Sequence, residues 1–397
     1  MATASATVSR WSRGFVAAGA LWFVAWQVAA LAGAPRSTGV LLGVYGFVLH
    51  VAFGKAYALV PSYFDRDLAA PRAPALHLPL AVGGVAGLVA EDLGLAAGWS
   101  GPAGGALWAG GVAVFVGTLG WTVRDNLSGR ETGTGEHNAA RRPVDRVANA
   151  AVPVAVAYLA AGASETLAVA VGGPTLLGAY GPVRSHLFAA GFAALLLFAV
   201  GFRLLPRFLV AAPPAPLAWV VLGAGALGPL FLALGLPGGR LLLVGAALEG
   251  TAVLGFAAAY GWLFAASDRD RVGFYPVLAG VVAGVLGVAL GVHLALAGVT
   301  TALATAHYRL MALGFLSLAV VGVTVQFYPP SVGRFPGAGD RAAWLVVGAL
   351  VAGLGLEVVG LLAGTPVLAV AGRTLVLAGA VGYAYLLLGL FVQRARA

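Results

Sequence analysis

Apolar runs of about twenty residues recur along the whole chain, separated by short stretches that contain Pro, Gly or charged residues. A helix of about 20 residues crosses the roughly 30 Å hydrocarbon core of a bilayer. Of the 397 residues, 60% are hydrophobic and only 9% are charged. So few charges cannot cover a water-facing surface, because ordinary globular domains carry about 25% charged residues. We therefore predict an all-α integral membrane protein, a single polytopic domain over residues 1–397 in contact with the lipid bilayer.

The breaks between the apolar runs predict about twelve transmembrane helices. Gly, Ala and Val dominate these runs, and small residues let helices pack closely in lipid. The first run, residues 14–32, resembles a secretory signal but is long for one, so we expect it to be the first span. The predicted spans cover residues 12–34, 38–61, 76–97, 103–123, 148–171, 183–206, 214–235, 240–266, 274–298, 303–329, 341–363 and 368–392.

Basic residues favour one face of the predicted bundle. Of the 23 Lys and Arg residues, 17 lie at one face and 5 at the other. The positive-inside rule then predicts that both termini are cytoplasmic. The membrane is expected to be a prokaryotic plasma membrane. The basic residues are scattered rather than gathered in a patch, so we expect no nucleic-acid partner. One sizeable polar segment, residues 123–147, is expected to be a flexible, solvated cytoplasmic loop. The outer-face basic residues are Arg36, Arg184, Arg240, Arg309 and Arg373.

Three segments share one pattern, Gly-Phe followed by thirteen residues and then Pro. They fall in the second, sixth and tenth predicted spans, at equal intervals and in the same direction. The glycine predicts a close helix contact, and the proline predicts a helix end or kink. The repeat indicates three pseudo-equivalent units of four helices each. The segments are Gly46-Phe47 to Pro61, Gly191-Phe192 to Pro206, and Gly314-Phe315 to Pro329.

The same three spans carry His50, His186 and His307. An ionisable side chain within a bilayer is costly and marks a functional-site hypothesis. A packing or hydrogen-bonding role is the alternative for any one of them. The remaining histidines are expected elsewhere: His77 at a membrane interface, His137 in the cytoplasmic loop and His293 in a structural role. Two acidic residues within spans, Glu249 and Glu357, are candidates to carry protons or to pair with a histidine.

Motifs in these spans resemble the haem-copper oxidase subunit I superfamily, and within it the NnrS-type haem-copper membrane proteins. In span two, HVAFGKAYALVP begins at His50 and resembles the helix that ligates the low-spin haem. In span ten, HYRLMALGFLSLAVVGVTVQFYPP begins at His307 and resembles the HxH helix of the superfamily, with Arg309 in place of the second histidine. In span six, SHLFAAGFAALLLFAVGFRLLPRF contains His186 and resembles the corresponding NnrS-type helix. The resemblance implies twelve helices in three arcs of four.

The resemblance also implies a b-type haem, with His50 and His307 as the ligand pair and His186 as a third candidate for metal ligation. If Pro330 rather than Pro329 sets the register of span ten, the assignment of His307 is open. Span seven lacks the family's copper-ligating histidines. We therefore expect neither a complete copper site nor oxygen-reducing activity, and the chain is not expected to be a competent terminal oxidase. Any other enzymatic activity is left open.

A b-type haem needs cations for its propionates, and the resemblance implies Arg184, Arg309 and Arg373 for this role. The alternative is that these arginines lie at the lipid headgroups. The functions implied are electron transfer, haem or copper handling, or a response to nitric oxide, with further subunits or a redox protein as candidate partners. The chain has no Cys, which excludes haem attached through a CxxCH motif. A membrane transporter or another non-haem membrane protein is the alternative function.

Overall fold

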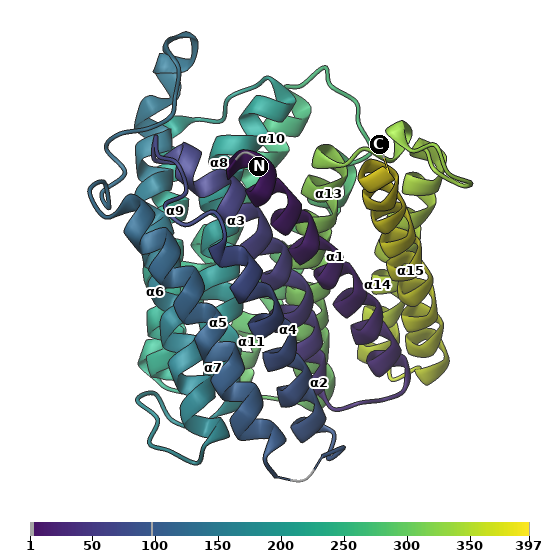
Figure 1. The fold of residues 1–397 in the computed structure, drawn as a ribbon. Helices are drawn as coiled ribbons and strands as arrows, with labels where there is room; N and C mark the ends of the chain where they lie inside the picture. Colours follow the sequence, from purple (N-terminus) through teal and green to yellow (C-terminus); the bar gives the residue numbers. More distant parts are fainter. Residues whose placement is uncertain (1–3, 97, 397) are drawn as a thin grey trace.

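The computed structural model describes residues 4–96 and 98–396. All regular secondary structure in these two segments is helical. Among the described residues, twelve helices or runs of helices are long and apolar enough to cross a membrane, as a multi-pass membrane protein requires. Figure 1 shows them side by side in one bundle, with the start of α1 and the end of α15 at the same end. The predictions of an all-helical multi-pass membrane protein and of about twelve spans are confirmed.

Nine spans are built on one α-helix each, and three are composite. The nine are α1 (Ala4–Leu31), α4 (Ala73–Asp92), α5 (Ser100–Val123), α6 (Arg142–Ala170), α9 (Ala215–Gly235), α10 (Arg240–Ala265), α11 (Phe274–Ala297), α14 (Asp340–Leu362) and α15 (Pro366–Arg396). The composite spans are α2 (Arg36–Val40), η1 (Leu41–Val48) and α3 (Leu49–Tyr63); α7 (Gly181–His186), η3 (Leu187–Ala194) and α8 (Leu195–Leu209); and α12 (Thr301–Tyr308), η4 (Arg309–Ser317) and α13 (Leu318–Phe327). Two short 3-10 helices extend spans five and ten: η2 (Glu136–Arg141) directly precedes α6, and η5 (Pro330–Val332) follows α13.

Each composite span contains one π-helical segment, and that segment includes the Gly-Phe pair of the repeat. The repeat glycines pack closely on the preceding span, as predicted, because a Cβ added at any of them would come within 3 Å of a side chain there. The contacts are Gly46 with Trp22 on α1, Gly191 with Tyr158 on α6, and Gly314 with Ala283 on α11. The repeat prolines lie near helix ends: α3 ends just after Pro61, α8 ends just after Pro206, and α13 ends before Pro329.

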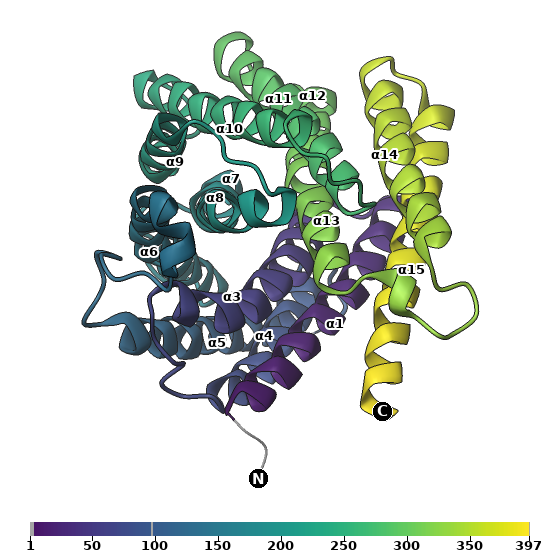
Figure 2. The ribbon, with the colours of Figure 1, turned by 90° about the horizontal axis from the view of Figure 1, so that it is seen from above.

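The three composite spans form the middle of the bundle. Their apolar windows are 72%, 78% and 67% buried, whereas those of the other nine spans are 28–50% buried. The three π-helical segments contact one another, and Figure 2 shows α3, α8 and α13 inside the outer helices. Side chains of these spans therefore face other helices rather than lipid, so they are suited to form a site inside the bundle.

The loop predicted at residues 123–147 is shorter than expected, because α6 already begins at Arg142. It is also only partly solvated. Asn126 and Thr134 are buried, whereas Glu136 and His137 are exposed. The Asn126 side chain donates to the Phe64 carbonyl at 3.2 Å and thereby attaches the loop to the end of span two. Gly, Thr and Asn gave this segment the composition of a free loop, but the Asn126 side chain donates to backbone carbonyls and the Thr134 hydroxyl donates to Asp145.

Candidate functional site

His186 and His307 face each other across the middle of the bundle. Their ring centres are 6.4 Å apart and their planes differ by 18°. The Nδ1 atom of His186 lies 2.7 Å from the Pro182 carbonyl, and that of His307 lies 2.8 Å from the Gly287 carbonyl. A carbonyl only accepts hydrogen bonds, so each Nδ1 carries the hydrogen and each Nε2 keeps its lone pair. Both imidazoles are therefore held in the tautomer that binds a metal through Nε2.

The two histidines line a cavity of about 250 Å³ among spans two, six, seven, eight, nine and ten. Most of its wall is apolar, with side chains such as Val288, Met311 and Leu316. Glu249 on α10 supplies a carboxyl group to the wall, and its Oε1 atom is buried without a hydrogen-bond partner. The cavity therefore combines two available imidazole nitrogens and one carboxyl group with a low-dielectric surrounding.

A second cavity, of about 990 Å³, adjoins the first, and Arg36 and Tyr308 line both. Small-molecule and cofactor sites usually occupy about 300–1,000 Å³. The three arginines singled out in the sequence, Arg184, Arg309 and Arg373, all line this larger cavity. The structure thus gathers the predicted cationic residues, together with Arg36, around one space next to the histidine pair.

Arg309 and Arg373 share one buried acidic partner. The Arg309 Nε donates to Glu357 Oε2 at 2.8 Å, and the Arg373 Nε donates to Oε1 of the same carboxylate at 2.9 Å. Arg309 is 2% exposed, so the lipid-headgroup alternative is wrong for this residue. Glu357 pairs with arginines rather than with a histidine. This ion-pair cluster joins span ten to the hairpin of α14 and α15.

His50 lies in a different environment. Its ring is buried, and its Nδ1 lies 2.9 Å from the Tyr45 carbonyl. Phe15, Trp22 and Phe53 surround it, with ring centres 6.1–6.5 Å away. It lines neither of the two cavities. The structure therefore brings His307 together with His186, and surrounds His50 with aromatic side chains.

The prediction for His77 is wrong. This residue is buried, its Nδ1 lies 3.1 Å from the Tyr57 hydroxyl, and it packs against Phe15 and Phe53. His50 contacts the same two phenylalanines, so a second histidine cluster lies between α1, α3 and α4. We predicted His77 at the membrane interface because it lies near the start of a helix. The sequence does not indicate which face of α4 packs against the rest of the bundle. His137 and His293 are exposed.

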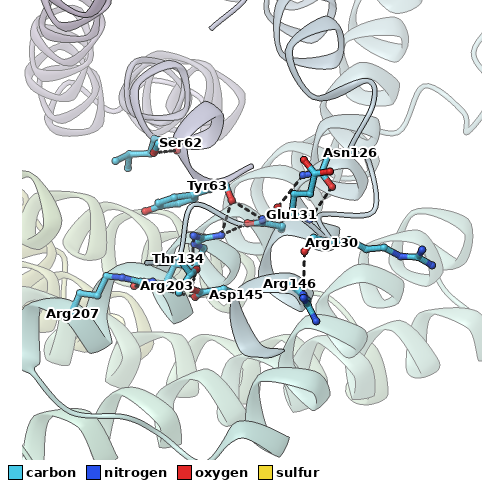
Figure 3. A network of polar contacts seen from close by, with 12 residues as sticks. Ser62, Tyr63, Asn126, Arg130, Glu131, Thr134, Asp145, Arg146, Arg203 and Arg207 are labelled. Carbon is cyan, nitrogen blue, oxygen red and sulfur yellow. Dashed lines mark hydrogen bonds and ion pairs between the residues drawn. The ribbon is translucent and has the colours of Figure 1, made fainter. Parts of the chain in front are cut away.

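A polar network at the end of the bundle near the loop was not predicted (Figure 3). Arg203 and Asp145 are 2% and 1% exposed, and they lie 3.8 Å apart. Arg207 pairs with the same Asp145 at 2.8 Å, and the Thr134 hydroxyl donates to it at 2.5 Å. Arg203 also donates to the Tyr63 carbonyl at 3.0 Å. The network therefore joins the ends of spans two, five and six to the loop, which is a structural role.

Within the described residues, no group of three or more His, Asp or Glu side chains is arranged to hold a metal ion. The His186–His307 pair is thus a two-imidazole site. The sequence matches no protein-family model and no curated protein. The functional assignment consequently rests on the geometry of this pair and its cavities.

Proposed function

We propose that this chain is a haem-binding multi-pass membrane protein in which His186 and His307 are the ligands of a b-type haem. The separation of the two rings carries this proposal. Two imidazoles on one metal ion, with metal–nitrogen bonds of about 2 Å each, place their ring centres about 6 Å apart. The distance of 6.4 Å between the ring centres is close to this value. Both Nε2 atoms are also free to bind.

The surroundings fit the other needs of a haem. The ring requires an apolar slot, and most of the wall around the two histidines is apolar. The propionates require cations, and Arg36 and Arg184 lie on the wall of the adjoining larger cavity without an ion-pair partner among the described residues. Arg309 and Arg373 add positive charge to the same wall, although Glu357 balances part of it.

We further propose that the helices are arranged in a way similar to those of haem-copper oxidase subunit I and NnrS-type proteins. It comprises three pseudo-equivalent four-helix units with both termini cytoplasmic, in a prokaryotic plasma membrane. The π-helical segments at the three Gly-Phe positions support it, as does the packing of each repeat glycine on the preceding span. Span seven contributes no histidine. We therefore propose neither a complete copper site nor terminal oxidase activity.

A haem bound here supplies one-electron redox chemistry. The protein contributes the geometry around it. The Pro182 and Gly287 carbonyls fix the orientation of the two imidazoles, and the apolar wall limits access of water. The function proposed is electron transfer or haem handling, including a response to nitric oxide, with a redox protein or further subunit as partner.

The direct test is the absorption spectrum of the protein purified after expression with added haem. A Soret band that shifts on reduction, with haem in a constant ratio to protein, is expected. Haem-free protein that takes up a substrate into liposomes would instead favour the transporter alternative. Absence of a Soret band after reconstitution with haemin would contradict the proposal.

A further inference from the structure

Four buried hydrogen-bond donors near the larger cavity have no partner within the part of the chain that the structure describes. They are Trp26 Nε1, Gln27 Nε2, Tyr308 OH and Arg309 Nη1. Native proteins satisfy most of their buried polar groups, so a cluster of unsatisfied donors requires an explanation such as a missing ligand. These four atoms lie on the adjoining spans one and ten. The His186–His307 pair involves none of them.

Three of these residues, Trp26, Tyr308 and Arg309, line the cavity. The Arg309 guanidinium carbon lies 5.1 Å from the centre of the Trp26 ring, and the Trp26 and Tyr308 ring centres are 5.9 Å apart. A Cβ added at Gly39 would lie 2.7 Å from the Tyr308 hydroxyl and 3.3 Å from Trp26 Nε1. The missing side chain of Gly39 therefore makes room for the Tyr308 hydroxyl, which lies next to Trp26 Nε1.

The wall of the larger cavity around these donors carries a net positive charge. Glu357 accepts hydrogen bonds from both Arg309 and Arg373, so two cations share one carboxylate. The acidic residues elsewhere on the cavity wall already have donors. Glu91 accepts from the Ser100 hydroxyl, and Asp92 accepts from the Thr38 hydroxyl. Since these hydroxyls are neutral, all the charges on the wall count: four arginines face three carboxylates, which leaves one positive charge without a counter-ion.

We propose that Trp26, Tyr308 and Arg309 form a binding site for a small oxyanion, such as a carboxylate or a phosphate. An oxyanion only accepts hydrogen bonds, which suits the indole N–H, the phenol O–H and the one guanidinium nitrogen, Nη1, that have no partner among the described residues. Charge-assisted hydrogen bonds to a guanidinium are also the stronger kind. The oxyanion is either free in solution or the carboxylate of a larger bound molecule, including a haem propionate.

The test measures binding of inorganic phosphate and of acetate to haem-free protein in a neutral detergent, by titration calorimetry at constant ionic strength with chloride as the reference anion. Saturable binding of at least one oxyanion is expected. Trp26→Phe and Tyr308→Phe each remove one donor and keep the Arg309–Glu357 pair. Each is expected to weaken the affinity about tenfold, because a hydrogen bond to a charged group is lost.

Trp219→Phe and Tyr180→Phe are the matched controls, because both side chains are exposed and neither is part of the donor cluster. They should leave the affinity unchanged. Thermal unfolding of each variant without added anion measures its stability, which separates lost binding from lost folding. Haem-free protein that binds neither oxyanion, or variants that bind as tightly as the wild type, would overturn the site for a free oxyanion.

If Trp26→Phe and Tyr308→Phe lower only haem retention, the carboxylate is a haem propionate. Oxyanion binding without any Soret band would support this site and contradict the proposed function.

Discussion

The imidazole rings of His186 and His307 lie 6.4 Å apart and nearly parallel, although they come from different composite spans. Each histidine stands just before a π-helical segment, η3 or η4. A π-helical turn contains more residues than an α-helical turn and changes the direction of the side chains that precede it. We infer that the π-helical segments orient the two histidines toward the shared cavity.

Replacement of Glu357 by Gln is expected to destabilise the protein. It would leave the buried Arg309 and its neighbour Arg373 without a negative partner. Loss of one member of a buried ion pair costs about 3–5 kcal/mol, so the thermal midpoint of unfolding in detergent should fall. Asp268→Asn is the control, because that side chain is exposed. Equal midpoints for the two variants would show that the Arg309–Glu357 pair does not stabilise the fold.

Gly191→Ala tests the close contact between spans five and six. The added methyl group would lie 2.5 Å from the Tyr158 ring, so the helices must separate. Overpacking of this kind costs about 1–3 kcal/mol, which denaturation in mixed micelles can measure. Gly223→Ala is the matched variant, because nothing lies within 4 Å of a Cβ at that glycine. It should be neutral or slightly stabilising, since alanine favours a helix over glycine. A smaller effect at Gly191 than at Gly223 would contradict the packing described.

The Arg66 guanidinium beside Asp125 holds the pKa of that carboxyl below its usual value of 3.8. A folded-state pKa below the unfolded-state value means that the pair stabilises the loop above about pH 4, and that this contribution is lost as the pH falls through the folded-state pKa. Arg66→Gln should move the pKa of Asp125 back toward 3.8. NMR titration of the labelled aspartate carboxyl carbons measures this change. Arg130→Gln should leave the pKa unchanged, and an equal shift in both variants would indicate a general charge effect instead.

The spans were predictable because their signal is strong and local. Each is an apolar run long enough to cross the bilayer, and the Gly-Phe pattern also identified three close helix contacts that the structure contains. The π-helical segments were not predictable, because no composition or spacing distinguishes them from α-helix. The loop ends were missed for a related reason: Arg142 and Asp145 are polar but belong to the first turns of α6.

The candidate site was only partly predictable. His186 and His307 were identified because ionisable residues in apolar spans are conspicuous. Their pairing depends on helix tilt and on the rotation between spans, which one sequence does not contain. The cluster of Arg309, Glu357 and Arg373 was missed for the same reason, since its members lie on three different helices. The burial of His77 likewise depends on which face of α4 packs against α3.

The most direct measurement is the haem content and Soret spectrum of four single variants, His186→Ala, His307→Ala, His50→Ala and His293→Ala, expressed with added haem. His293 is exposed and serves as the control. Because His186 and His307 are proposed to be the two ligands, each of their variants should lose haem or change the Soret band from that of a bis-imidazole complex. The His293→Ala protein should resemble the wild type. Full haem content and an unchanged spectrum in both His186→Ala and His307→Ala, with loss of haem in His50→Ala instead, would contradict the account.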